Sequence, residues 1–579
     1  MTAKKNPSLR LSPSRKRAFT AALSVAGILL TVTSAHADAT WNVDAAGSWA
    51  TDSNWNPAPA PGSISSTTNT DTATFGSVIT AARAVTVDTD RNISGINFSG
   101  NSFAYTLSGG NLLLTAGGTI QTSGAGSNTF VDNVNSAITL QGDYTFTGGS
   151  TNTNHTLSIG TTVTSAVSGG TTTLTLNGAN TGASGTNTAT NVITGVISNG
   201  TSTVAISKSG AGKWALSGAN TFTGGVIITE GTLEVQNNAA LGTGTVTLAG
   251  GTLSASGGAD RTITNNITVQ TGTTSTLNTN GRNLTINGNI SGSGNINRAV
   301  PPTATGVALG GNNSGFTGTF TQANNGNAVV RFSSVNAGSA NASWVFQNTT
   351  AGRTTIGLGG TGINGTISFG SMTGGGTIQS DATGTKTISA GALGLNDIFA
   401  GVIANGTGTV ALTKVGTGTM TLSGNNTYTG ATTVNAGTLA LGAANRIANT
   451  SALVLAGGTF ATGGFSETLG SLTLSAISSI DFGSGTSALV FAASNGNTWT
   501  GTLNLLNFDI GTDSLSFSSI GGLTVSQLGQ ISLAGFTATG LDASGFVQFS
   551  AIPEPSTYAV LAGVLTLGVA SFRRRRTSV

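Results

Sequence analysis

The chain has 579 residues, of which 87 are glycine, 7 % are charged, 6 % are aromatic and none is cysteine. Soluble domains average about 25 % charged residues and about 7 % glycine, so this composition argues against ordinary helical domains. The lack of cysteine excludes disulfides, thiol nucleophiles and cysteine metal sites.

The positive charge is concentrated at the two ends of the chain. Without the six basic residues of segment 1–37 and the four of segment 573–576, 12 basic residues remain against 18 acidic ones in segment 38–551, a net charge of −6. The formal charge of +3 for the whole chain therefore does not indicate a basic patch, and no nucleic-acid partner is expected.

Residues 1–37 are typical of a secretory signal peptide. A basic start is followed by an apolar run over residues 18–32 and by Ala35-His36-Ala37, the small-x-small pattern of a cleavage site. We expect a signal peptidase to cleave between Ala37 and Asp38. The alternative is an N-terminal membrane anchor, but the apolar run is shorter than the roughly 20 residues that a helical span needs.

Residues 38–79 contain Trp41, Trp49 and Trp55, ahead of an apolar segment at 71–75. We interpret this region as a cap for the end of the β-structure that follows, because a stack of strands needs its open end covered. Ordinary terminal coils are the alternative.

Residues 80–465 alternate short apolar runs with Gly and Asn. Examples lie at 226–228, 245–248, 284–286 and 452–455, and each is bounded by residues that tolerate tight turns. The pattern predicts short β-strands joined by corners rather than disorder, because disordered chains are poor in aliphatic residues.

An internal repeat with an offset of 206 residues decides the expected architecture. Lys208-x-Gly210-x-Gly212 returns as Lys414-x-Gly416-x-Gly418, L-S-G-A-N-T-F-T-G at 216–224 returns as L-S-G-N-N-T-Y-T-G at 422–430, and Gly231-Thr232-Leu233 returns as Gly437-Thr438-Leu439. The clear copies cover about 195–260 and 401–465, a degenerate copy lies at 309–318, and a faint echo lies at 142–149.

Apolar positions that persist between the copies are predicted to point into the coil. They are Leu216, Phe222, Leu233, Leu422, Tyr428 and Leu439. Gly218, Gly224, Gly424 and Gly430 are expected at corners, where a side chain would clash or φ is positive. Asn220 and Asn426 either stack in internal ladders or close turns with their side-chain amides, and the sequence leaves this open.

The motif resembles the autotransporter-associated β-strand repeat of large surface proteins. That resemblance implies an all-β fold, a right-handed parallel β-helix (solenoid), with capping regions at both ends. At roughly 20–25 residues per coil and about 4.8 Å per coil, some 16–20 coils would form a rod of about 80–100 Å. Residues 466–551 are the expected C-terminal β region and the second possible cap.

Residues 552–579 combine three features in a fixed order. Pro553-Glu554-Pro555 is followed by an apolar stretch at 558–572 and by Arg573, Arg574, Arg575 and Arg576. This order resembles the PEP-CTERM sorting signal of Gram-negative bacteria. The resemblance implies transient anchoring in the inner membrane by the apolar helix, cleavage near the motif by an exosortase-type enzyme, and delivery to the cell surface or extracellular matrix. A permanent C-terminal anchor is the alternative.

The sequence contains few residues of the types that act in catalysis, and no cofactor or metal is expected. Gly360-x-Gly362-x-x-Gly365 matches a dinucleotide fingerprint only by chance in a glycine-rich chain, because no helix follows it. His155 is interpreted as a solvated strand or turn residue. The remaining candidates are sparse charged groups, namely Asp88 and Asp90 beside Arg91, Glu230 with Glu234, and Asp509 with Asp513.

Asp88 and Asp90 are the best enzymatic candidates, because residues two apart in a strand share one face. A turn with solvated charges after Val87 is the simpler interpretation. Glu230 and Glu234 are replaced by Ala436 and Ala440 in the second copy, so the structure of the repeat does not require them.

Together these features predict an exported, non-enzymatic β-helical protein. Its expected role is structural or adhesive at the cell surface or in the extracellular matrix, with polysaccharide as a possible partner along its Thr/Asn/Ser-lined outer face. The first alternative is a secreted polysaccharide-active enzyme. The second is an autotransporter passenger, which would require an outer-membrane barrel where this sequence carries an apolar stretch and arginines.

Overall fold

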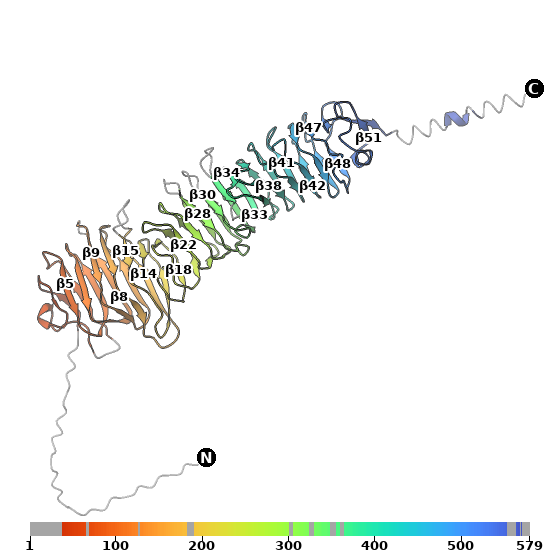
Figure 1. Ribbon diagram of the computed structural model, residues 1–579. Helices are drawn as coiled ribbons and strands as arrows, with labels where there is room; N and C mark the ends of the chain where they lie inside the picture. Colours follow the sequence, from red (N-terminus) through yellow and green to blue (C-terminus); the bar gives the residue numbers. More distant parts are fainter. Residues whose placement is uncertain are drawn as a thin grey trace, which may run out of the picture.

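The computed structural model describes residues 37–64, 69–124, 128–181, 190–299, 305–322, 329–347, 355–358, 364–552, 563–567 and 569. In these residues the chain forms about 18 parallel coils that stack into a long rod (Figure 1). The expected all-β solenoid is therefore confirmed. Helical segments within the described residues are short: η1 (Asp52–Asn54), α1 (Val525–Leu528) and residues 563–567.

One wall of the rod is a sheet whose strands pair in parallel from coil to coil, apart from the antiparallel pair β1–β3. Its strands alternate buried apolar residues with half-exposed Thr and Ser, which is the expected pattern for a sheet with one buried face. The first wall consists of β1 (Ala39–Trp41), β3 (Trp55–Asn56), β4 (Thr72–Phe75), β6 (Arg91–Ser99), β8 (Leu112–Ser123), β10 (Ile138–Leu140), β11 (Tyr144–Gly148), β13 (Val163–Ser165), β14 (Thr171–Asn177), β16 (Thr203–Lys208), β18 (Val226–Ile228), β20 (Val246–Leu248), β23 (Ile267–Val269) and β26 (Ile290–Gly292).

A second wall runs along the rod and pairs in parallel as far as β50. Its N-terminal part consists of β2 (Gly47–Ser48), β5 (Arg83–Val87), β7 (Tyr105–Gly109), β9 (Phe130–Val134), β12 (His155–Ile159), β15 (Asn191–Ile193), β17 (Lys213–Leu216), β19 (Thr232–Val235), β21 (Thr252–Ala255), β24 (Thr274–Asn278), β27 (Asn295–Ala299), β29 (Thr319–Gln322), β31 (Ser339–Phe346) and β33 (Gly365–Gly374).

The long strand β33 pairs with two later strands, β35 and β36, so the pairing divides into two rows beyond it. One row consists of β35 (Thr385–Ala390), β38 (Thr409–Lys414), β40 (Thr432–Val434), β42 (Leu453–Leu455) and β45 (Leu472–Leu474). The other consists of β36 (Asp397–Phe399), β39 (Thr419–Leu422), β41 (Thr438–Leu441), β43 (Thr459–Ala461), β46 (Ser478–Asp481), β48 (Leu503–Leu506) and β50 (Ile531–Leu533). The strands β38 and β40 are the counterparts, one repeat later, of β16 and β18 in the first wall.

Two smaller parallel sheets complete the coils from β22 onward, in the C-terminal half of the rod. One consists of β22 (Arg261–Ile263), β25 (Leu284–Ile286), β28 (Gly306–Leu309), β30 (Val329–Phe332), β32 (Thr355–Leu358), β34 (Thr377–Ser380) and β37 (Val402–Ala404). The other consists of β44 (Glu467–Leu469), β47 (Ala488–Phe491) and β49 (Ser514–Ser516).

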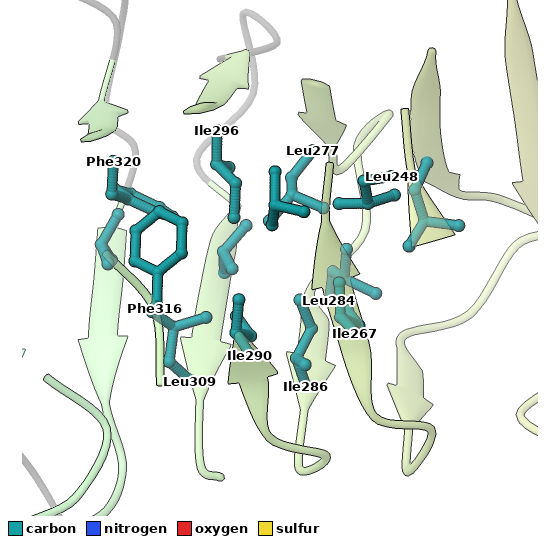
Figure 2. Packing of buried hydrophobic residues seen from close by; sticks show 14 of the residues in the cluster. Leu248, Ile267, Leu277, Leu284, Ile286, Ile290, Ile296, Leu309, Phe316 and Phe320 are labelled. Carbon is teal, nitrogen blue, oxygen red and sulfur yellow. The ribbon is translucent and has the colours of Figure 1, made fainter. Parts of the chain in front are cut away.

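The interior holds stacked side chains from all the walls. Figure 2 shows one stretch in which Leu277, Ile296 and Phe320 lie in one row and Ile267, Ile290 and Phe316 lie nearby. All of these residues are buried. Because each coil rests on the next, the buried apolar residues form one continuous cluster from Ala39 to Val547.

The N-terminal end of the rod is filled by the tryptophans of region 38–79. Trp41, Trp49 and Trp55 are buried around Phe75, with ring centroids 5.1–6.1 Å apart. Each indole N–H donates to a backbone carbonyl, for example that of Trp55 to Trp49 at 2.7 Å. The antiparallel pair β1–β3 lies at this end and the parallel stack begins with β1–β4.

The C-terminal end is antiparallel. The strand β50 pairs with β51 (Phe536–Leu541), which pairs with β52 (Val547–Ala551), so the last strands fold back instead of adding another coil. Parallel pairing thus runs from β1 to β50, across the boundaries drawn from sequence at residues 79 and 465.

Candidate functional site

The repeat has a buried apolar skeleton that is the same in both copies. Leu216, Phe222, Leu233, Leu422, Tyr428 and Leu439 are all fully buried. The four leucines lie on strands β17, β19, β39 and β41, and the two aromatic residues lie in the corners that follow β17 and β39. Tyr428 adds a hydroxyl, which hydrogen-bonds to Thr432 at 2.7 Å. The first copy has Phe222 and the apolar Val226 at these positions.

The glycines of the motif leave room for the neighbouring coil. A Cβ at Gly218 would lie 2.2 Å from the carbonyl oxygen of Gly195, and one at Gly424 would lie 1.8 Å from that of Gly401. Gly224 and Gly430 are restricted in the same way, because a Cβ would lie 2.5 Å from a backbone oxygen of Val204 or Val410. Close packing of coils, rather than positive φ, therefore requires glycine at these four corners.

The repeat asparagines link three successive coils. The side-chain oxygen of Asn220 accepts the backbone N–H of Ile197 at 2.8 Å, and its amide donates to the carbonyl of Ala240 at 2.6 Å. Asn426 makes the equivalent bonds to Ile403 and Arg446 at 2.7 and 2.8 Å. Each amide thus bonds to backbone groups of the adjacent coils rather than to other asparagines, and the Asn426 amide also donates locally to the carbonyl of Gly424 at 3.1 Å.

The degenerate copy keeps this bridge. Asn313 accepts from the backbone of Ile290 and donates to the carbonyl of Ala337, both at 2.8 Å. The bridge therefore persists where most of the surrounding motif has drifted.

The repeat lysines point into the rod. Lys208 and Lys414 are fully buried, and Lys208 Nζ donates to the carbonyls of Ser209, Gly210 and Glu230 at 2.8, 2.6 and 3.1 Å. Lys414 Nζ donates to the matching carbonyls of Val415, Gly416 and Ala436 at 2.7, 2.8 and 3.2 Å. The third acceptor lies on the next coil, so each ammonium group joins two coils. The hydrogen bond survives the replacement of Glu230 by Ala436 in the second copy, because the acceptor is the backbone carbonyl.

Burial lowers the pKa of Lys208 to about 8, while the nearby Glu230 carboxylate opposes the shift. Burial also lowers the pKa of Lys414. Three carbonyl oxygens provide the hydrogen bonds that a buried ammonium group needs. Sequence reasoning did not predict these buried lysines, although Val204, Ile206 and Lys208 share the inward face of one strand by their spacing of two.

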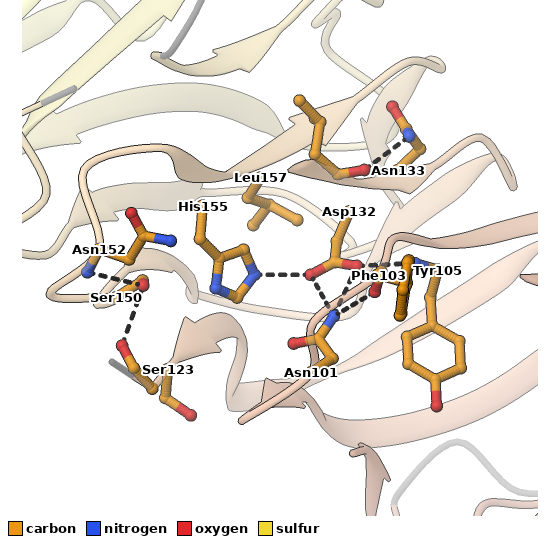
Figure 3. A network of polar contacts seen from close by, with 12 residues as sticks. Asn101, Phe103, Tyr105, Ser123, Asp132, Asn133, Ser150, Asn152, His155 and Leu157 are labelled. Carbon is orange, nitrogen blue, oxygen red and sulfur yellow. Dashed lines mark hydrogen bonds and ion pairs between the residues drawn. The ribbon is translucent and has the colours of Figure 1, made fainter. Parts of the chain in front are cut away.

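A separate buried network surrounds His155, which was expected to be solvated (Figure 3). The Nε2 atom of His155 lies 2.7 Å from Asp132 Oδ2, and both residues are buried. Asp132 also accepts from the Asn101 amide at 3.1 and 3.2 Å and from the backbone N–H of Tyr105 at 2.8 Å. The aspartate is thus surrounded by donors, which is how a buried carboxylate is stabilised.

The acidic candidates from the sequence do not converge. Asp88 follows β5 and pairs with Arg91 through contacts of 2.8 and 2.5 Å. Asp90 has a positive φ of 56° in the same turn, so the two aspartates do not share a strand face. Glu234 pairs with Lys213 at 3.3 Å, and Asp513 accepts from the backbone of Asp509 at 2.9 Å. Within the part of the chain that the structure describes, no three His, Asp or Glu side chains gather as a metal site would require.

The predicted processing sites lie at the limits of the described residues. Ala37 and Asp38 are exposed, and Asp38 accepts the backbone N–H of Thr72 at 2.7 Å. Ala35, Pro553, Glu554, Pro555 and the arginines at 573–576 lie outside the described residues. Among the helices that the structure describes, none is long and apolar enough to span a membrane.

Comparison with known proteins adds one match, and it falls on the repeat. The family described as the passenger-associated transport repeat matches residues 206–235 and 412–441. These segments include the buried lysine, the bridging asparagine and the apolar skeleton of each copy. No curated protein and no solved structure matches the chain. The molecule is thus a β-solenoid that carries two repeats of the autotransporter-passenger type, and this repeat implies export and display at a cell surface.

Proposed function

We propose that this protein is a non-enzymatic structural or adhesive rod that associates with extracellular polysaccharide. Its export and surface display follow from the passenger repeat, and its length follows from the stacked coils. The polysaccharide association is supported by two rows of half-exposed hydroxyls, one on the first wall and one on β33 and the row from β35 to β45 that follows it.

Outward-facing hydroxyl groups are in register within each of these two rows. Successive partners in the N-terminal half are Thr145, Thr175, Ser207, Ile227, Thr247, Thr268 and Ser291. The corresponding row in the C-terminal half is Ser368, Ser389, Thr413, Thr433, Val454 and Thr473. All but Ile227 and Val454 carry a hydroxyl, and all are half-exposed. We call these two rows the hydroxyl wall.

The hydroxyl wall carries no charge. The charged residues in its strands are Lys208, Lys386 and Lys414, and all three are buried. Adjacent strands lie about 4.8 Å apart, so within each row the hydroxyls recur at that spacing, interrupted at Ile227 and at Val454. Such a surface suits an extended, uncharged polymer that also presents hydroxyls at regular intervals.

Binding to this wall would gain strength from repetition. One hydrogen bond contributes about 0.5–1.5 kcal/mol net, too little to hold a chain in water. Many contacts along one rigid rod raise the overall avidity, because each contact after the first forms at a high effective concentration.

A pull-down with insoluble neutral polysaccharide tests the proposal. Replacing Thr145, Thr175, Thr247 and Thr268 by valine removes four hydroxyls at nearly constant shape, and we expect binding to fall about tenfold. The matched control replaces Thr232, Thr252, Thr276 and Thr321, which are half-exposed on the second wall. Equal binding by both variants and the parent protein would exclude the hydroxyl wall, and release of soluble sugar during the assay would favour the enzymatic alternative.

The repeats favour a second candidate, an autotransporter passenger. A passenger is exported and displayed whatever it binds, so this role is compatible with the rod described above. Protease treatment of intact native cells, followed by an immunoblot for the rod, tests display directly. Disappearance of the full-size band after treatment supports display, and an unchanged band would contradict it.

A further inference from the structure

Arg298 is a buried cation whose hydrogen bonds are incomplete. It lies on β27, is fully buried, and faces the interior between its register partners Leu277 and Gln322. Its Nη2 donates to the carbonyl of Thr305 at 2.7 Å, but among the described residues Nε and Nη1 have no hydrogen-bond partner. Leu277, Ile296 and Phe320 occupy the same stretch of the interior (Figure 2).

Other buried cationic side chains of the rod have more hydrogen-bond acceptors than Arg298 has. Lys208 and Lys414 each reach three carbonyl oxygens, as described above. Arg91 has the Asp88 carboxylate and the carbonyls of Pro61 and Gly62. Arg298 has one described acceptor and no carboxylate.

Neutralisation by proton loss is not available to Arg298. Burial lowers the pKa of its guanidinium to about 10, which still leaves the group charged at neutral pH. An unpaired charge in a low-dielectric interior costs several kcal/mol, so a counter-charge within reach would be strongly favoured.

Among the residues that the structure describes, no carboxylate pairs with Arg298. No Asp or Glu occurs between Asp260 and Asp381, whereas that segment contains Arg261, Arg282, Arg298, Arg331 and Arg353. Asp260 is exposed and accepts from the backbone and side chain of Asn283. Asp381 forms an ion pair with Arg331.

We propose that Arg298 holds a small inorganic anion of the chloride type inside the middle coils of the rod. A monatomic anion needs no directional partners of its own and supplies the charge that the protein lacks here. Water could bond to the two unpartnered nitrogens but would leave the charge in place. This site does not depend on polysaccharide binding.

Hydrogen exchange in sodium chloride and in sodium gluconate at equal ionic strength tests the site. Gluconate is too large for a packed interior, so only chloride should protect the amides of β24, β27 and β29. At ten times its dissociation constant, chloride should raise their protection about tenfold, because it binds only the folded coils. Amides of β4 and β43, far along the rod, should not respond.

Two variants separate a specific site from general salt effects. Arg298→Met removes the charge at similar length and should abolish the chloride dependence, whereas Arg282→Met, at an exposed position, should retain it. If Arg298→Met fails to fold, crystals of the parent protein grown in bromide give an independent readout through anomalous scattering beside Arg298. Equal protection in both salts, or an equal chloride effect in parent and Arg298→Met, would overturn the proposal.

Discussion

At the scale of single residues, this rod places ionisable groups inside and satisfies most of them with backbone atoms. The buried lysines bond to carbonyls, and Asp132 bonds to an amide, an imidazole and a backbone N–H. Backbone N–H and C=O groups at the corners that do not hydrogen-bond to neighbouring strands can act as donors and acceptors for such side chains. A coil can therefore bury a charge where another fold would need an opposite charge.

Glu467 gives a residue-scale prediction about pH. The side chain is buried, its Oε2 accepts from the backbone of Arg446 at 2.7 Å, and Oε1 has no hydrogen-bond partner among the described residues. Burial raises its pKa from 4.5 to about 7, although the backbone N–H groups of Arg446 and Ile447 oppose the shift.

Because the folded pKa lies above the unfolded one, the folded coils bind the proton more tightly. The resulting stability is fully present below about pH 4.5 and is lost as the pH rises through about 7. We expect the local free energy of unfolding around β44 to fall by about 3 kcal/mol across that range, at 1.36 kcal/mol per pKa unit. Hydrogen exchange of β44 and β47 at several pH values measures it. Glu467→Gln, which stays neutral, should remove the slope, and an identical slope in both proteins would contradict the assignment.

At the scale of the element, each coil depends on the coil next to it for its stability. The strands of one repeat are short, β18 having three residues and β19 four. Isolated strands of this length are not stable, so their order depends on the coils above and below. The bridging Asn220 and the inward Lys208 both reach into a neighbouring coil and strengthen this dependence.

Phe222→Ala tests that dependence. The ring is fully buried, and a Cβ at Gly242 of the next coil would lie 3.0 Å from it. Its removal should cost about 3–5 kcal/mol locally and lower hydrogen-exchange protection over residues 200–250. Protection around β43 and β46 should not change, because solenoid coils interact mainly with their neighbours. Thr221→Ala, at an exposed position one residue earlier, is the control. Unchanged protection near Phe222, or loss along the whole rod, would disprove local cooperativity.

At the scale of the whole molecule, the first and last described strands of the rod lie beside the predicted processing sites. The first strand, β1, starts at Ala39 and the last, β52, ends at Ala551. Cleavage before Asp38 and near Pro553-Glu554-Pro555 would therefore leave every strand that the structure describes in the rod.

Intact-mass measurement of the protein from native cells checks this prediction. We expect a chain that begins at Asp38 and ends close to the Pro-Glu-Pro motif, as the signal peptide pattern and the sorting-signal resemblance imply. A mass that includes Phe572 and the four arginines would instead identify the tail as a permanent anchor, and a mass that includes residues 1–37 would exclude signal cleavage.

Sequence by itself determined the class of fold and the units from which it is built. The 206-residue offset, the alternation of apolar and polar residues, and glycine at the corners all follow from local requirements that repeat in every coil. Period-two alternation in short runs predicted strands joined by tight turns, and the resemblance of the repeat implied the all-β solenoid that the structure shows.

Only the tertiary structure decided which residues meet across coils. Asn220 could have formed a ladder or a turn, and the choice depends on Ile197, 23 residues earlier along the chain. The polar local sequence predicted that His155 is exposed to solvent. This prediction was wrong, because His155 is buried and its ring hydrogen-bonds to Asp132, 23 residues earlier in the chain. The hydroxyl wall and the incomplete environment of Arg298 likewise arise from register between coils. Sequence spacing fixes which face a side chain occupies, whereas the length of every intervening corner fixes its neighbours, and that length varies from coil to coil.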